Sequence, residues 1–113
     1  MALTFTKLFA PLQLPAAVAV IYTCPASPAT MVLKNGRVRL ANTTAGPVTA
    51  TLYAVPNGGS PTAANEFMAA QSIPANSFVD VDVPTLAAGD TLQGLAGAAT
   101  SITIHELGGV LYS

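Results

Sequence analysis

The sequence contains little charge, since only 8% of its 113 residues are Asp, Glu, Lys or Arg, against roughly 25% in an ordinary soluble domain. Charge normally keeps a free protein surface hydrated and monomeric. Because 51% of the residues are apolar, we expect much of the surface to contact copies of the chain or a partner. The formal net charge of −1 gives no reason to expect nucleic acid or an acidic membrane as that partner.

Cysteine, tryptophan and long apolar runs are also scarce. The one cysteine, Cys24, can form neither an internal disulfide nor a metal cluster by itself, and we expect it to pack as a small hydrophobic residue. Tryptophan is absent and aromatic residues make up 6%, which disfavours a binding site built on aromatic platforms. No apolar run reaches the roughly 20 residues of a membrane-spanning helix without Pro or Thr. Pro11 and Pro15 interrupt the apolar helix expected of a cleaved signal peptide.

Short alternating segments dominate the rest of the chain. Apolar and polar residues alternate with period two in 48–55, 78–83 and 101–106, and nine Pro and nine Gly residues cut the chain too often for long helices. The pattern predicts an all-β fold, an antiparallel β-sandwich of jelly-roll type with eight or nine strands. The predicted core consists of the apolar residues of the alternating segments, namely Val38, Leu40, Leu52, Val79, Val81, Ile102 and Ile104.

The predicted organisation is an extended N-terminal arm, residues 1–15, followed by the β-sandwich domain, residues 16–113. The arm is apolar, with Lys7 as its one charged residue, and it lacks the alternation of the domain. We therefore expect it to reach onto a neighbouring subunit. Segment 66–73 is rich in Ala, so that a strand and a helical turn both remain open there.

Three of the four basic residues, Lys34, Arg37 and Arg39, surround the dipeptide Asn35-Gly36. Asn-Gly is the strongest short signal for a two-residue β-hairpin, because a type I′ turn needs positive φ at both central residues. Two interpretations of the basic cluster follow. It either keeps an exposed hairpin soluble, or it docks on an acidic surface of a partner. The second makes Lys34, Arg37 and Arg39 the candidate partner contact.

Residues suited to catalysis are few. His105 and Glu106 are neighbours on a predicted strand, so their side chains point to opposite faces. Asp80 and Asp82 share one face, and such a pair is more often a solvated face than a metal or glycosidase site. A G-x-S-x-G motif is absent. We therefore expect that the protein is not an enzyme and that it has no catalytic, cofactor-binding or metal-binding residues.

Five short motifs along the chain, taken together, resemble a known group of proteins. They are Tyr-Thr-Cys-Pro at 22–25, Leu-Ala-Asn at 40–42, Leu-Tyr-Ala-Val at 52–55, Gly-Gly-Ser at 58–60 and Ala-Gly-Asp-Thr-Leu-Gln at 88–93. Each motif alone is weak, but in this order they cover nearly the whole chain. Together the sequence resembles the small β-sandwich virion proteins of tailed bacteriophages, of the capsid cement or decoration kind.

The resemblance implies a non-enzymatic structural protein of the phage head, assembled in the host cytoplasm, that stabilises the shell by bridging its subunits. Its partners would be the major capsid protein or other virion proteins, and it would act as a homo-oligomer without cofactor, nucleic acid or membrane. Two alternatives remain open. One is a head–tail connector or tail component, and the other is a receptor-binding or carbohydrate-binding module.

Overall fold

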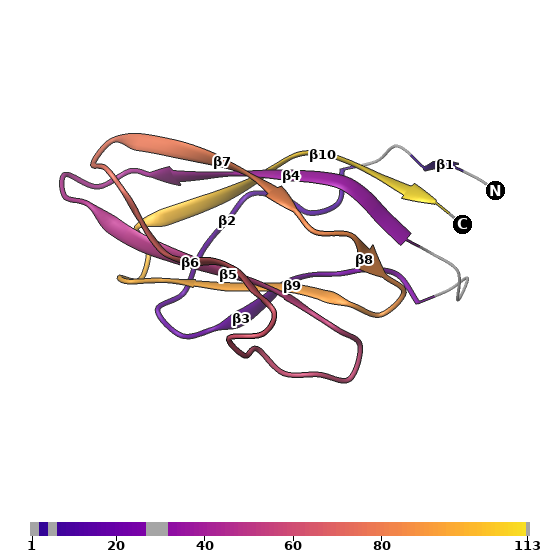
Figure 1. Cartoon of the computed structure of the whole chain (residues 1–113). Helices are drawn as coiled ribbons and strands as arrows, with labels where there is room; N and C mark the ends of the chain where they lie inside the picture. The colour runs from indigo at the N-terminus through magenta and orange to yellow at the C-terminus, as the bar shows by residue number, and fades with distance from the viewer. Residues whose placement is uncertain (1–2, 5–6, 27–31, 113) are drawn as a thin grey trace.

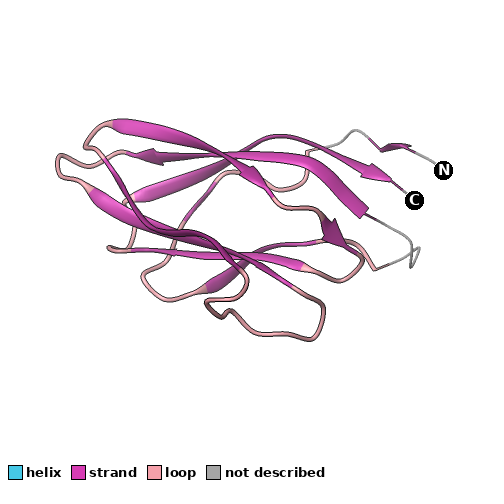
Figure 2. Ribbon diagram, viewed as in Figure 1, coloured by secondary structure: helices cyan, strands magenta, loops and turns pink. Residues whose placement is uncertain are grey.

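The computed structural model describes residues 3–4, 7–26 and 32–112, and these form two antiparallel β-sheets packed face to face (Figure 1). Figure 2 shows strands and loops throughout. Within the described residues, there is no helix that is long and apolar enough to cross a membrane. The predicted all-β antiparallel sandwich is confirmed.

One layer, sheet A, has six strands and the other, sheet B, has four. The strands of sheet A are β1 (Leu3–Thr4), β2 (Leu12–Gln13), β4 (Val32–Asn42), β7 (Ser77–Val83), β8 (Leu86–Ala87) and β10 (Ile102–Tyr112). Their order is β1-β10-β4-β7, with β2 also on β10 and β8 also on β4. The strands of sheet B, in spatial order, are β3 (Ala19–Thr23), β9 (Thr91–Ala96), β5 (Val48–Val55) and β6 (Glu66–Ile73). The segment left open by the sequence, 66–73, is therefore a strand.

From β2 to β10 the chain passes from one sheet to the other at most of its connections. Exceptions are β5–β6, which are neighbours in sheet B, and β7–β8, which both lie on β4 in sheet A. Connections that cross from one sheet to the other are typical of Greek-key sandwiches, to which jelly rolls belong. This alternation favours the jelly-roll assignment, which stays a prediction.

The described part of residues 1–15 lies on the sandwich of its own chain. Both β1 and β2 pair with β10, at opposite ends of that strand. Leu14 is completely buried, and its backbone N–H donates to the carbonyl of Ile102 at 2.8 Å. Pairing of this kind covers part of an edge that β10 would otherwise expose. The packing therefore continues across residue 15, and contact of the arm with a neighbouring subunit stays a prediction.

The predicted hairpin at Asn35-Gly36 is wrong, because β4 runs straight through it from residue 32 to 42. Asn35 has φ of 57°, but Gly36 is not among the described residues with positive φ, so a type I′ turn cannot form. Instead, Asn35 and Gly36 stand opposite the single residue Gly109 of β10, which makes a β-bulge. A Cβ at position 36 would lie 3.2 Å from the Cβ of Val83, so the glycine permits close packing there.

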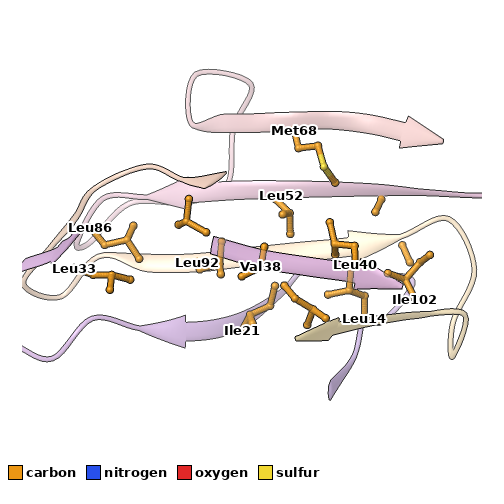
Figure 3. Close-up of a cluster of buried hydrophobic side chains, with 14 of the residues drawn as sticks. Leu14, Ile21, Leu33, Val38, Leu40, Leu52, Met68, Leu86, Leu92 and Ile102 are labelled. Carbon is orange, nitrogen blue, oxygen red and sulfur yellow. The ribbon is translucent and has the colours of Figure 1, made fainter. Parts of the chain in front are cut away.

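The core lies between the two sheets (Figure 3), and the residues that alternation predicts make up part of it. Five of the seven predicted core residues are at most 2% exposed: Val38, Leu40, Leu52, Ile102 and Ile104. The other two, Val79 and Val81, are half-buried and pack against this cluster. They lie on β7, which is at the edge of sheet A, where one side of a strand has no neighbour to cover it.

Candidate interaction surfaces

The outer face of sheet A carries a fork-shaped ion pair between Arg39 on β4 and Asp80 on β7. The two residues are directly opposite each other in the strand register. The Nε of Arg39 donates to Oδ1 of Asp80 at 2.7 Å, and its Nη2 donates to Oδ2 at 3.1 Å. Such two-bond geometry is the strong form of an arginine–carboxylate contact. It fixes the position of the guanidinium over the strand pair β4–β7.

An exposed aromatic ring extends this arrangement. The guanidinium carbon of Arg39 lies 4.1 Å from the centre of the Phe78 ring, well within the range of a cation–π contact. Phe78 nevertheless remains 53% exposed. Beside it is an open depression of about 360 Å³, whose lining includes Phe78, Arg39, Asn76 and His105. This corner of sheet A therefore offers an aromatic ring with polar neighbours.

The other predicted contact residues lie along β4 and not at the tip of a hairpin. Arg37 is opposite Asp82, and its Nε is 3.8 Å from Oδ1 of Asp82, with both side chains exposed. Exposed pairs of this kind contribute about 0–1 kcal/mol. Lys34 lies on the other side of the bulge and is exposed. The three basic residues thus share one strand, and Asp80 and Asp82 face two of them.

The Arg39–Asp80 pair has a measurable electrostatic signature. Hydrogen bonds from Arg39 hold the pKa of the Asp80 carboxyl below its ordinary value, although partial desolvation of the carboxyl acts in the opposite direction. A lowered pKa in the folded protein means that the pair stabilises the fold above the ordinary pKa of an aspartate, about 3.9. That stabilisation is lost as the pH falls through the lowered pKa of Asp80.

We expect Arg39→Gln to raise the pKa of Asp80 toward its ordinary value, because the substitution removes both charge-assisted hydrogen bonds. Carboxyl-carbon NMR titration of the folded protein measures this directly. Arg37→Gln is the matched control, since Arg37 is the weakest of the influences on Asp80, and it should change that pKa far less. An unchanged Asp80 pKa in the Arg39→Gln protein would contradict the ion pair.

His105 and Glu106 lie apart, as their neighbouring positions predict. His105 lines the depression on the outer face of sheet A. Glu106 lines a small cavity together with Tyr22 and Leu92, residues of sheet B. No group of three or more His, Cys, Asp or Glu side chains suited to a metal ion occurs in the described part of the chain.

Cys24 is buried, as predicted, and lies where β3 meets the loop before β9. Its Sγ is 3.5 Å from the carbonyl oxygen of Leu86, and its backbone N–H donates to the carbonyl of Asp90 at 2.8 Å. Burial raises the pKa of the thiol, which leaves it protonated and unreactive at neutral pH. Cys24 therefore contributes to packing between β3 and its neighbours.

Sheet B presents a different outer face, because Glu66 is the one charged residue in its four strands. The outward row runs from Val20 across Gln93 and Tyr53 to Glu66 in the strand register. Val20 is 55% exposed, and Val18, just before β3, is 42% exposed. Period-two alternation could identify outward residues on each strand, but which strands share a sheet depends on the topology. The sequence analysis therefore missed this face.

Comparison with known proteins establishes a fold likeness and no family. No family model matches the chain, and no curated protein sequence matches it significantly. Among solved structures, it is similar to a protein of Bacillus endospore appendages, described as a novel family of disulfide-linked pili. That likeness has a TM-score of 0.58 and 21% identity, and covers 98% of this chain and 88% of the other.

A chain in the structure of infectious bursal disease virus, Gx strain, also matches, with a TM-score of 0.49 and 14% identity. The match covers 97% of this chain and 30% of the viral one.

Proposed function

We propose that this chain is a structural subunit of a repeated protein assembly and that it has no catalytic role. The observation that supports the proposal most directly is that the outer faces of the two sheets differ in charge. The face of sheet A carries charges paired within the chain, whereas the face of sheet B carries one charged residue and exposed valines. A subunit that bridges neighbours needs two contact faces, and faces of different chemistry select different partners.

Within this class, we propose a capsid cement protein of a tailed bacteriophage, located in the phage head. The five motifs of the sequence support this assignment, and the major capsid protein or other virion proteins would be its partners. Lys34, Arg37 and Arg39 remain the proposed contact with the shell. Because Arg39 is held by Asp80, we expect the contribution of Arg37 to shell binding to fall more with added salt than that of Arg39, since salt screens exposed charges over about 8 Å at physiological ionic strength.

A pilus subunit is the second candidate, favoured by the fold likeness to the endospore appendage protein over almost the full length of both chains. That protein is described as disulfide-linked. Here the lone cysteine is buried. A pilus built from this chain would therefore not be linked through Cys24 as it is packed in this fold.

Immunogold electron microscopy with antibodies raised against the purified chain tests both candidates on material from the organism that encodes it. Label spread over the heads of virions in an induced lysate supports the cement protein. Label at the neck or tail would support the connector or tail alternative, and label along surface filaments would support the pilus subunit. If the protein is found only in soluble extract, outside any particle or filament, the structural role itself is wrong.

A further inference from the structure

Within the described residues, the edge of sheet B formed by β3 exposes the apolar side chains of Val18 and Val20. In the described residues β3 pairs with β9 alone. Val20 is opposite Gln93, which lies between the buried residues Leu92 and Gly94 of β9. Val20 therefore points away from the core. Among the described residues, four large apolar side chains are markedly exposed: Val18, Val20, Phe78 and Leu107. Two of these four lie together at this one edge.

The charges of the chain are collected on the other sheet. The strands of sheet A contain six of the nine charged residues: Lys34, Arg37, Arg39, Asp80, Asp82 and Glu106. Sheet B has Glu66 alone, at the far edge from β3. Between Lys7 and Lys34 there is no charged residue at all. The part of this face around Val18 and Val20, formed by β3 and its neighbour β9, consequently has no charged residue on its strands, which is unusual for a solvent-facing sheet.

A patch without charge suits a two-fold contact between identical chains. In such a contact the same patch meets itself, so any net charge on it faces an equal charge of the same sign. A partner of opposite charge would instead require a charged patch here. The absence of charge from this face therefore favours a second copy of the chain as its occupant.

The available area is sufficient. A specific interface buries about 800 Å² on each partner, which is about one seventh of the 5609 Å² accessible surface of this chain. The molecule measures 46 × 27 × 17 Å along its principal axes, so it has broad faces. The outer face of one sheet can supply such an area, and two sheets can pack face to face about 10 Å apart.

We propose that the outer face of sheet B, centred on Val18, Val20 and the neighbouring Leu95 and Tyr53, is the contact surface with a second copy of this chain. The contact is two-fold and packs sheet B against sheet B. It leaves the charged face of sheet A directed outward on both copies. This inference deepens the proposed function, since it names the partner of one face of the structural subunit.

Sedimentation velocity of the purified full chain tests the proposal without any virion or filament. We expect the unaltered protein to form a dimer that dissociates on dilution. Val18→Asp and Val20→Asp should each give a monomer, because a charge placed in the patch faces its own copy. Both positions are exposed in the single chain, so the variants should fold, which far-UV circular dichroism verifies.

Leu107→Asp is the matched control. Leu107 is 44% exposed, against 42% for Val18, but it lies on β10 in sheet A. This variant should dimerise as the unaltered protein does. The proposal is overturned if the unaltered chain stays monomeric at the highest soluble concentration, or if the two valine variants still dimerise. A monomeric chain that labels phage heads would refute the dimer alone, and a dimeric chain found in no particle would refute the structural role alone.

Discussion

Leu52→Ala should lower the free energy of unfolding by about 2–5 kcal/mol, the range for truncating a buried leucine. Leu52 is fully buried in β5 (Figure 3). Its partner across the ladder is Gly94, where a Cβ would lie 2.7 Å from the Cδ2 of Leu52. The leucine thus fills space that its neighbour leaves free. Because a glycine has no side chain that can relax into the vacated volume, we expect a loss toward the upper end of that range, measured by urea unfolding.

Thr49→Ala is the control for this change. Thr49 lies on the same strand, is exposed and points to the outer face, so the substitution should change stability by no more than about 0.5 kcal/mol. Thr51 would be a poor control, because it is 8% exposed and its Oγ1 accepts a hydrogen bond from the backbone of Ala70. A Leu52→Ala protein as stable as the Thr49→Ala protein would show that the core is not packed as described.

The longer strands and part of the core could be predicted because their signal is local. Alternation of apolar and polar residues is a property of a single strand. It places β5 at 48–55 with the same bounds as the structure and β7 within one residue. It likewise separates buried Val38 from outward Arg39.

The features that could not be predicted are those that depend on which strands are neighbours in a sheet. The partner of Arg39 lies 41 residues away, and nothing in the sequence near either residue shows that β4 and β7 are neighbours. The charge-poor face of sheet B could not be predicted for the same reason, since its four strands are spread along the chain from residue 19 to residue 96. The predicted hairpin turn at Asn35-Gly36 was wrong for a related reason. The local turn preference is real, but pairing along the whole of β10 favours one continuous strand with a bulge.

Asn42→Ala should lower the free energy of unfolding by about 3 kcal/mol, because Asn42 joins the two sheets through a buried hydrogen-bond network. It is 2% exposed at the end of β4. Its Nδ2 donates to the carbonyls of Gly46 at 2.9 Å and Ile73 at 3.0 Å, and its Oδ1 accepts from the backbone N–H of Thr44 at 2.9 Å. Each group left buried without a partner costs about 1–3 kcal/mol. Ile73 ends β6 of sheet B, so its carbonyl lies where solvent cannot easily replace the amide.

Asn65→Ala is the control that separates the effect of burial from the effect of removing any asparagine side chain that bonds to the backbone. The amide of Asn65 also bonds to the backbone, accepting from Thr62 at 3.0 Å and donating to Ser60 at 3.0 Å, but both bonds are exposed. Water can take the place of that amide, so we expect a loss of no more than about 1 kcal/mol by the same urea measurement. If the two variants lose the same stability, then burial does not decide the contribution of Asn42. In that case the junction of the sheets at this end must depend on apolar packing alone.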